Sequence, residues 1–509
     1  MSRNNTSETP KGNDRRTMTR RRFIGVMAGL PPLALTGASA IAAVTTENAM
    51  SNHVETDYDE IYRPQFHFTS RTNWLNDPNG LVFDQGEYHL FFQHNPFGLQ
   101  SGNLTWGHAI SKDLVHWDQL PDAIEPDHLG PIWSGSAVVD RENTTGFQTG
   151  PNDTLVAIYT AAGGTSPESK GQPFTQCIAY STDRGRRWTK YSHNPVLPHV
   201  VGEDRDPKVV WYEPDRRWIM ALYLDADRYA LFSSPDLKQW TMLEDFSMEG
   251  CGECPDFFEI PVEGETGQSR WVFTAANGKY LVGQFDGKRF VREGGIGQVE
   301  YGANCYAVQT YSGIPEHDGR RIQIGWMAGG SYPGMPFNQQ MSFPCVLTLH
   351  RLKDGLHLFK QPAREIERLH EKPHRWRDLT LQPGENPLST VSGDLFDIRV
   401  ELEMADAAEF GVKARGASVS CNVKEQMLSS AGRTAPLEME NGRIQLQILV
   451  DRTSFEVYGN HGRAALSSCF LPVKGEPDLE IYAVGGPVQI KSLEVFPLHR
   501  AWPGTSGRM

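Results

Sequence analysis

The sequence predicts an all-β protein made of two β domains. Short runs of apolar, β-branched and aromatic residues recur along most of the chain, and no long segment shows the 3.6-residue apolar period of an amphipathic helix. Clusters of Gly, Pro, Asn and Asp separate these runs, as turns between strands require. A chain of 509 residues also exceeds one ordinary hydrophobic core, so two domains are the expected number.

The first β domain is expected over residues 62–352. Its strand-like runs are 80–82, 88–93, 155–160, 209–212, 218–224, 271–275 and 322–327. Three segments that begin at Ser111, Ser181 and Ser234 share the pattern Ser-x-Asp, a basic stretch and a tryptophan. Each follows a short apolar run, so the pattern predicts a turn repeated between two strands of propeller blades with variable loops. Chance recurrence is the alternative.

A connecting segment is expected over residues 353–377, with a short helix at 363–370. The second β domain follows over residues 378–500. Its alternating runs are 396–404, 409–413, 443–450, 454–458 and 480–483. Alternation of this kind is typical of half-buried strands, so this domain is predicted to be a sandwich of two packed sheets.

Residues 1–45 are predicted to be an export signal and processing region, and residues 46–61 a linker. Twin arginines precede an apolar run from Phe23 to Leu35, and Ala38-Ser39-Ala40 resembles a cleavage site. This order is typical of a bacterial Tat-type signal, so the mature protein is expected in the periplasm or outside the cell. A membrane anchor is the weaker alternative, because the apolar run is short and contains Pro31-Pro32.

Charge and cysteine content exclude several classes of partner. The net charge of −13 argues against nucleic acid and against an anionic membrane surface. Seven cysteines are an odd number, which disfavours a disulfide framework in a chain of this length. Cys251 and Cys254 form a C-x-x-C pair that could serve metal or redox chemistry, but no second pair of this kind exists. We therefore expect no metal and no cofactor.

Three acidic residues are held by rigid local sequence. Asp77 lies in Trp-Leu-Asn-Asp-Pro-Asn-Gly, Asp206 in Asp-Arg-Asp-Pro, and Glu253 in Gly-Glu-Cys-Pro. Proline restricts both its own backbone and that of the residue before it, and Asn-Gly is a strong turn signal. Asp77 is therefore predicted to be aimed by a tight turn between two strands; an ordinary Asx turn is the alternative.

Taken together and in this order, the three motifs resemble those of glycoside hydrolase family 32, the invertase, inulinase and levanase family. The resemblance covers residues 62–498, since the segment 451–458 resembles part of the family's C-terminal domain. It implies a five-bladed β-propeller, whose axial funnel holds the active site, followed by a β-sandwich. It also implies that Asp77 is the nucleophile, that Glu253 is the general acid/base and that Asp206 holds fructose hydroxyls.

These roles suit a reaction in two displacements, which needs a nucleophile and an acid/base. Backbone N–H groups of the expected turn would keep Asp77 ionised, and Arg205 would orient Asp206. Further positions match the family's sugar pocket less distinctively, and ordinary packing is the alternative for each: Asn76, Gln93, Trp133, Ser134 and Trp326. Two other residues, His67 and Trp106, are expected to be mainly structural.

Three departures from the family pattern concern the site of the leaving-group sugar. Many members carry tryptophan where this chain has Ser101, and an acid where it has Asn304, and residues 329–340 replace a tryptophan-rich run. The expected function is a secreted retaining β-fructofuranosidase that acts on terminal fructosyl residues of levan, inulin or sucrose. A fructosyltransferase and a non-catalytic fructan-binding protein are the alternatives.

Overall fold

The computed structural model describes residues 58–403 and 407–502. The predicted export signal, residues 1–45, and residues 46–57 of the predicted linker lie outside the described residues. In this described part, nearly all regular structure is β-strand, apart from two short 3₁₀ helices, η1 (Glu213–Asp215) and η2 (Arg364–Leu369). Among the described residues, none of the helices has the length and apolar character needed to span a bilayer.

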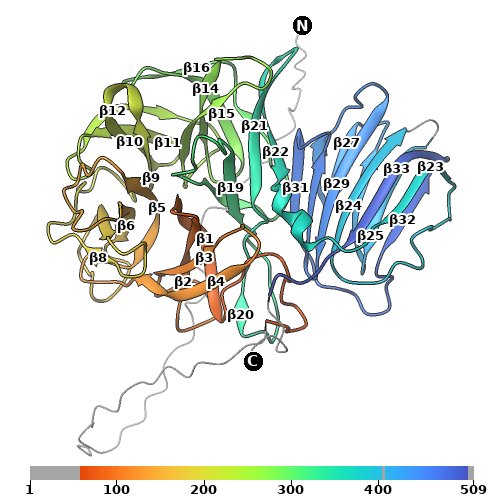
Figure 1. Ribbon diagram of the computed structural model, residues 1–509, viewed down its shortest axis with the longest axis horizontal. Helices are drawn as coiled ribbons and strands as arrows, with labels where there is room; N and C mark the ends of the chain where they lie inside the picture. The colour runs from red at the N-terminus through yellow and green to blue at the C-terminus, as the bar shows by residue number, and fades with distance from the viewer. Residues whose placement is uncertain (1–57, 404–406, 503–509) are drawn as a thin grey trace, which may run out of the picture. The chain divides into compact units, whose positions relative to one another are not determined.

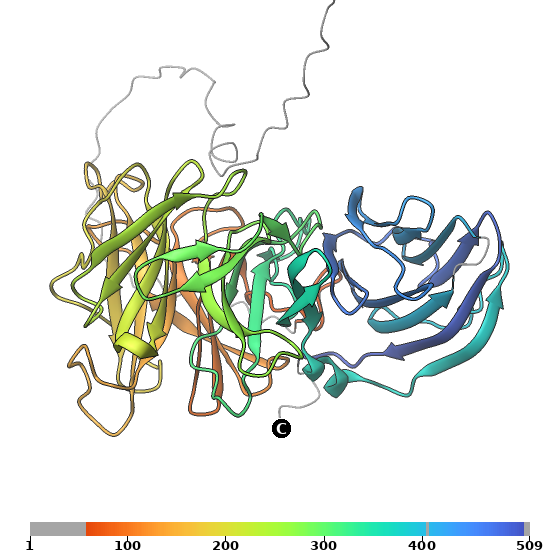
Figure 2. The same ribbon diagram turned by 90° about the horizontal axis from the view of Figure 1, so that it is seen from above.

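Five sheets surround a common axis and form a five-bladed propeller (Figures 1 and 2). Blade 1 contains β20 (Phe337–Asn338), β1 (Asn73–Asp84), β2 (Glu87–Asn95), β3 (Thr105–Ser111) and β4 (Trp117–Ile124). Blade 2 contains β5 (Ile132–Asp140), β6 (Thr154–Ala162), β7 (Phe174–Ser181) and β8 (Thr189–Lys190). Blade 3 contains β9 (Arg205–Tyr212), β10 (Arg217–Asp225), β11 (Arg228–Ser234) and β12 (Thr241–Ser247). Blade 4 contains β13 (Asp256–Pro261), β14 (Ser269–Thr274), β15 (Lys279–Phe285), β16 (Phe290–Arg292) and β17 (Gly297–Gln298). Blade 5 contains β18 (Tyr306–Thr310), β19 (Arg321–Trp326), β21 (Cys345–Leu352) and β22 (Gly355–Pro362).

The first strands of the blades, β1, β5, β9, β13 and β18, contact one another in a closed ring. Ser136 of β5 donates its hydroxyl to the carbonyl of Pro207 in β9 over 2.9 Å. Lys208 of β9 lies 3.4 Å from the carboxylate of Asp256 in β13, which also accepts the backbone N–H of Thr310 in β18. Since unpaired buried polar groups are costly, these contacts fix the blades at their inner edges.

The segment around Asp77 differs from the prediction of a tight turn. Residues Asn73–Asp84 form the single strand β1, and its pairing with β2 shifts register between Leu75 and Pro78 and again between Asn79 and Val82. Such bulges accommodate a proline, which cannot donate to the ladder, and re-aim neighbouring side chains. Gly80 has a φ of +54°, and a Cβ there would lie 2.6 Å from the Phe91 ring. The signals for a turn therefore produce an irregular strand.

The Ser-x-Asp and tryptophan pattern marks the same turn in three successive blades. It links β3 to β4, β7 to β8, and β11 to β12. In each turn the aspartate accepts backbone N–H groups: Asp113 from Val115 and His116, Asp183 from Arg187, and Asp236 from Lys238 and Gln239. The predicted turn is confirmed at all three positions, and it joins the third strand of a blade to the fourth.

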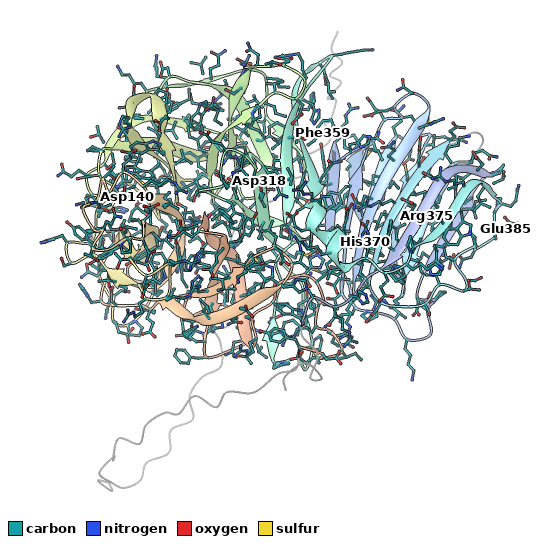
Figure 3. The ribbon with its side chains drawn as sticks, viewed as in Figure 1. Asp140, Asp318, Phe359, His370, Arg375 and Glu385 are labelled. Carbon is teal, nitrogen blue, oxygen red and sulfur yellow. The ribbon has the colours of Figure 1, made fainter. Side chains whose placement is uncertain are left out.

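The connection between the domains is shorter than residues 353–377. β22 pairs antiparallel with β21 along its whole length. It is therefore the last strand of blade 5 and not part of the connection. The helix expected at 363–370 is the short η2, and His370 directly after it bonds through its ring to Asp397 over 2.9 Å (Figure 3). The next strand begins at His374.

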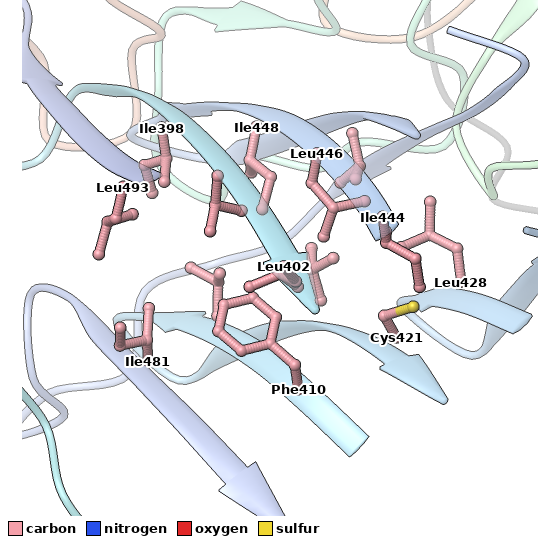
Figure 4. Close-up of a cluster of buried hydrophobic side chains, with 14 of the residues drawn as sticks. Ile398, Leu402, Phe410, Cys421, Leu428, Ile444, Leu446, Ile448, Ile481 and Leu493 are labelled. Carbon is pink, nitrogen blue, oxygen red and sulfur yellow. The ribbon is translucent and has the colours of Figure 1, made fainter. Parts of the chain in front are cut away.

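The C-terminal domain is a sandwich of two antiparallel sheets. One sheet contains β23 (His374–Leu381), β33 (Val488–Pro497), β24 (Phe396–Glu403), β29 (Arg443–Asp451), β30 (Ser454–Gly459) and β31 (Ala464–Cys469). The other contains β28 (Arg433–Pro436), β27 (Met427–Ser430), β26 (Ala417–Asn422), β25 (Glu409–Ala414) and β32 (Glu480–Val484). Apolar side chains of both sheets, among them Ile398, Phe410 and Ile448, form one buried core (Figure 4). Period-2 alternation along these strands supplies that core.

His67 joins the propeller to the sandwich. Its Nδ1 lies 2.8 Å from Asp451 and its Nε2 lies 2.8 Å from Glu456, and all three side chains are fully buried. Burial alone would lower the pKa of His67, but the hydrogen bonds and charges of the two carboxylates outweigh burial and raise it to about 9. His67 therefore has a structural role, as expected, because it bonds to two carboxylates of the other domain.

Candidate active site

The three predicted acids come from three different blades. Asp77 lies on β1, Asp206 is the second residue of β9, and Glu253 lies just before β13. Their exposed fractions are only 1%, 3% and 3%, respectively. Each lies on or beside the first strand of its blade, the strand nearest the propeller axis. The three carboxyl groups therefore all lie near the propeller axis, although they are far apart in the sequence.

Asp77 is held by side chains on both oxygens. The Ser134 hydroxyl, from β5 of the neighbouring blade, donates to Oδ2 over 2.5 Å, and the Asn76 amide donates to Oδ1 over 3.0 Å. Trp74 fixes Asn76 in turn, since its indole N–H donates to the Asn76 carbonyl oxygen over 2.8 Å. These donors orient the carboxylate and offset its loss of water, so Asn76 and Ser134 both hold Asp77 in place.

Asp206 adopts a left-handed backbone, with a φ of 63°. Its backbone N–H donates to the hydroxyl of Thr160 over 3.0 Å, and that hydroxyl is bonded in turn to Gln176. Its Oδ2 accepts the backbone N–H of Cys254 over 3.0 Å. A non-glycine residue held in this conformation stores strain that the surrounding contacts must maintain, which is common at functional sites.

Glu253 is gripped at both carboxylate oxygens. Nη2 of Arg205 donates to Oε1 over 2.7 Å, and the hydroxyl of Tyr306 donates to Oε2 over 2.6 Å. Glu253 and Cys254 are also left-handed, with φ values of 60° and 41°. Arg205 was expected to orient Asp206; its Nε lies 3.8 Å from that carboxylate, so its shorter contact is with Glu253.

Cys254 lies between two of the acids. Its sulfur is 3.7 Å from Oδ2 of Asp77 and 3.4 Å from Oδ2 of Asp206. From the sequence, Cys254 was noted only as part of a C-x-x-C pair, and the contact of Tyr306 with Glu253 was not predicted. Both contacts depend on blade packing and not on local sequence. Six cysteines, Cys177, Cys251, Cys305, Cys345, Cys421 and Cys469, are free thiols, and within residues 58–403 and 407–502 no cluster of His, Cys, Asp or Glu is arranged to hold a metal ion.

Among the predicted binding residues, Gln93 has a side chain whose hydrogen-bonding groups are left unsatisfied by the described residues. Its side chain is fully buried, and neither its amide nitrogen nor its carbonyl oxygen has a hydrogen-bond partner within the described chain. Buried polar atoms normally have partners, so a ligand with hydroxyl groups is a natural one. Trp133 and Trp326 are partly exposed, and each meets another aromatic ring edge-on, Phe174 and Trp74 respectively.

The three departures from the family pattern have different surroundings. Ser101 is exposed in the loop between β2 and β3. Asn304 donates to the carbonyl of Ala328 and accepts the backbone N–H of Cys469, so it links blade 5 to the sandwich. Gln339, in the segment 329–340, accepts the indole N–H of Trp326 over 3.0 Å.

All five blades thus contribute a polar group to the site. Blades 1, 3 and 4 contribute the three acids, and blades 2 and 5 contribute the hydroxyl groups of Ser134 and Tyr306. Chemically, the site offers one carboxylate supported by neutral donors and another held between a guanidinium and a phenol. Glycoside hydrolysis uses such a pair of carboxyl groups in different environments.

Comparison with known proteins agrees with this geometry. Residues 67–362 match the glycosyl hydrolases family 32 N-terminal domain, and residues 415–497 match the family's C-terminal domain. A levanase of Bacillus subtilis is 42% identical over 495 residues, which cover 88% of this chain and 72% of the levanase.

Two solved structures share the complete fold. The exo-inulinase from Aspergillus awamori has a TM-score of 0.79 at 29% identity, over 87% of this chain and 100% of that chain. A fructofuranosidase from Schwanniomyces occidentalis, complexed with fructose, has a TM-score of 0.75 at 27% identity, over 88% and 100% of the two chains. The matched domains and the levanase relative show that this chain belongs to glycosyl hydrolases family 32.

Proposed function

We propose that this chain is a retaining β-fructofuranosidase that releases terminal fructosyl residues from levan, inulin or sucrose. The observation that carries the proposal is the convergence of Asp77, Asp206 and Glu253 from three blades onto one buried polar site. Family membership supports glycoside hydrolysis. The levanase and exo-inulinase relatives and the fructose complex of the fructofuranosidase support a fructosyl substrate.

Asp77 is the nucleophile and Glu253 the acid/base in this proposal. The Asp77 carboxylate attacks the anomeric carbon and forms an ester, while the Glu253 carboxyl passes its proton to the departing oxygen. Glu253 then takes a proton from water, the water oxygen attacks the same carbon, and the Asp77 carboxylate is released. The donors on Asp77 support this role, since they hold its carboxylate in one orientation.

Asp206 and Gln93 bind sugar hydroxyls. A carboxylate accepts hydroxyl protons, whereas an amide can both donate and accept, so together they recognise several hydroxyls of one ring. Arg205 and Tyr306 position Glu253 between them. Trp133 and Trp326 supply partly exposed aromatic surface to the sugar.

We also propose that the protein is exported by a Tat-type signal and acts in the periplasm or outside the cell. The twin arginines, the short apolar run and the Ala-x-Ala site of residues 1–45 support this. Export would bring the enzyme to polymeric fructans that cannot enter the cell.

The test is to incubate the mature protein separately with levan, inulin and sucrose and to follow the products by chromatography. Free fructose without intermediate oligomers indicates release of terminal residues, and the relative rates give the linkage preference. Oligosaccharides formed at high sucrose concentration would indicate a fructosyltransferase. An absence of fructose from all three substrates would contradict the proposal, provided that the preparation is folded and monodisperse.

A further inference from the structure

A second cavity lies at the end of the propeller axis remote from the acids. Its volume is about 520 Å³, within the roughly 300–1,000 Å³ range of small-molecule sites. It is lined by the final residues of β5 and β9, by the middle of β13 and by the residues that follow β18. Ser134, Asp206 and Glu253, in contrast, lie at or before the beginnings of these strands, and Asp77 contacts Ser134. Val138 lies four positions after Ser134 on β5, which corresponds to about 13 Å of strand.

Buried polar contacts close the axis between the two ends. Nζ of Lys208 donates to the carbonyl of Thr310 over 2.5 Å, and the amide of Gln309 donates to the carbonyl of Gly135 over 3.0 Å. Lys208 is 2% exposed, so solvent does not pass through this layer at that point. A molecule in the second cavity is therefore distinct from the sugar bound at the catalytic acids.

Aromatic side chains form part of the lining of the second cavity. Trp211 is partly exposed and meets the ring of Trp218 edge-on at 4.8 Å, and Tyr212 and Trp271 also line the cavity. Tyr311 is 1% exposed, and its hydroxyl has no hydrogen-bond partner within the described chain. A buried hydroxyl without a partner is costly, so this one is available to a polar ligand in the cavity that it lines.

Charge decides which polar ligand fits. Three arginines and four glutamates line the cavity, and three of these seven form ion pairs: Arg141 with Asp153, Glu142 with Arg216, and Arg320 with Asp318. A polyanion or a polycation would meet charge of its own sign as often as the opposite. A neutral ligand with many hydroxyls can hydrogen-bond to charged groups of both signs, and its apolar ring face can pack on the aromatic rings.

We propose that this cavity is a second carbohydrate-binding site, and that it holds an internal stretch of the same fructan chain whose end is cleaved at the acids. The identity of the sugar as fructan rests on the proposed function, whereas the class of ligand rests on the cavity alone. A long chain held at two sites raises the effective concentration of its ends at the acids. Sucrose is too short to span both sites, so the second site does not raise its effective concentration at the acids.

Two variants remove the contacts that carry the proposal. Trp211→Ala removes the accessible ring, and Tyr311→Phe removes only the hydroxyl without a partner and leaves the packing intact. The matched control is Trp376→Ala, because Trp376 is also a partly exposed tryptophan and lies on β23 of the sandwich. We expect KM for high-mass levan or inulin to rise about three- to tenfold in the first two variants. Kinetics on sucrose should stay unchanged, as should all kinetics of the control.

Binding is measured separately from turnover, in the full-length Asp77→Asn background, by electrophoretic retardation in gels that contain levan, inulin or dextran. Retardation should weaken when Trp211→Ala or Tyr311→Phe is added. Unchanged polymer KM and unchanged retardation in both variants would overturn the second site, as would an Asp77→Asn protein that no polysaccharide retards. If the wild-type protein cleaved no fructoside, the proposed function would fail. Retardation that still depends on Trp211 would then assign the cavity to another neutral polysaccharide.

Discussion

Ser134 donates its hydroxyl to Oδ2 of Asp77 over 2.5 Å, although the two residues lie on the first strands of different blades. The position of the proposed nucleophile therefore depends on how two blades pack and not on β1 alone. A hydrogen bond to a charged group in a buried site is worth more than one between neutral groups, since its loss leaves the charge without compensation.

Ser134→Ala should lower kcat/KM for sucrose and fructans by about 10- to 100-fold, the worth of one hydrogen bond to a charged group. Steady-state kinetics measure the loss, and thermal unfolding confirms that the fold remains. Ser136→Ala is the matched control, because Ser136 is also buried on β5 but bonds to Pro207 and Val209 in place of an acid. Equal losses in the two variants would mean that β5 acts only through packing.

Asp77→Asn should abolish turnover while the fold survives. A neutral amide cannot form the ester with the anomeric carbon, yet it keeps the size of the carboxylate it replaces. Product formation is followed by chromatography, with mass spectrometry to exclude deamidation back to aspartate. Asp84→Asn, a buried acid at the other end of β1, serves as the control and should remain active. Retention of more than a few per cent of activity in the pure Asp77 variant would remove Asp77 from the nucleophile's role.

The first sugar released should be β-fructofuranose. In the proposed double displacement, water attacks the face from which the enzyme departs, so the configuration of the substrate is kept. Retaining enzymes hold their two carboxyl groups about 5–5.5 Å apart, whereas inverting ones leave room for water between them. NMR spectra recorded within the first minutes of hydrolysis distinguish the anomers before they equilibrate. An α-anomer as the initial product would contradict the retaining mechanism.

The architecture could be predicted because local patterns and the family's motifs agree. Alternating runs gave the sandwich strands, and the three Ser-x-Asp segments marked equivalent turns, since each aspartate caps its own turn. The local prediction at Asp77 was wrong. Proline and Asn-Gly normally break a strand, but here the pairing of β1 with β2 absorbs them as bulges.

The contacts between distant segments could not be predicted from sequence patterns. His67 meets Asp451 and Glu456 across more than three-quarters of the chain, and nothing near His67 in the sequence indicates a buried charged partner. The contacts of Tyr306 with Glu253 and of Cys254 with Asp206 are of the same kind, because the packing of the blades brings these residues together. Motifs therefore identified the acids, and tertiary structure was needed to find the groups that hold them.

His67 should make stability depend on pH on the alkaline side. Its pKa is about 9 in the folded protein and 6.5 when unperturbed, so its protonated form stabilises the fold fully below about pH 6.5. This contribution is lost as pH rises toward 9. In His67→Gln the loss of stability between these pH values should be smaller than in the wild-type protein. At pH 6 the variant should be less stable by about 3–5 kcal/mol, because the two carboxylates lose a buried cation.

Chemical denaturation at pH 6, 7.5 and 9 measures both effects of His67→Gln. His461→Gln, at an exposed turn of the sandwich, is the matched control and should follow the wild-type protein at every pH. Parallel stability curves for wild type and His67→Gln from pH 6 to 9 would show that His67 does not titrate in this range.

Glu253→Gln should separate the acid/base from the other acids. Without a proton for the departing oxygen, natural fructans should react about 100- to 10,000-fold more slowly, the usual worth of general acid catalysis. A fructoside with a good leaving group needs no such proton, so its first step should be largely preserved. The fructosyl-enzyme should then accumulate, because water lacks its base. Added azide attacks without deprotonation and displaces the Asp77 carboxylate, so it should restore turnover and yield a fructosyl azide.

Asp206→Asn is the comparison that makes this test specific. Asp206 accepts the backbone N–H of Cys254, the residue next to Glu253, and lies in the same buried site, but its proposed role is to hold the sugar. Azide should therefore give it no comparable rescue, and its defect should be similar for good and poor leaving groups. Turnover is measured with sucrose and with an activated fructoside, with and without azide. Were Glu253→Gln equally impaired on both substrates and insensitive to azide, its carboxyl would not be the proton donor. Arg205 and Tyr306, which hold both of its oxygens, would then serve to fix a binding residue instead.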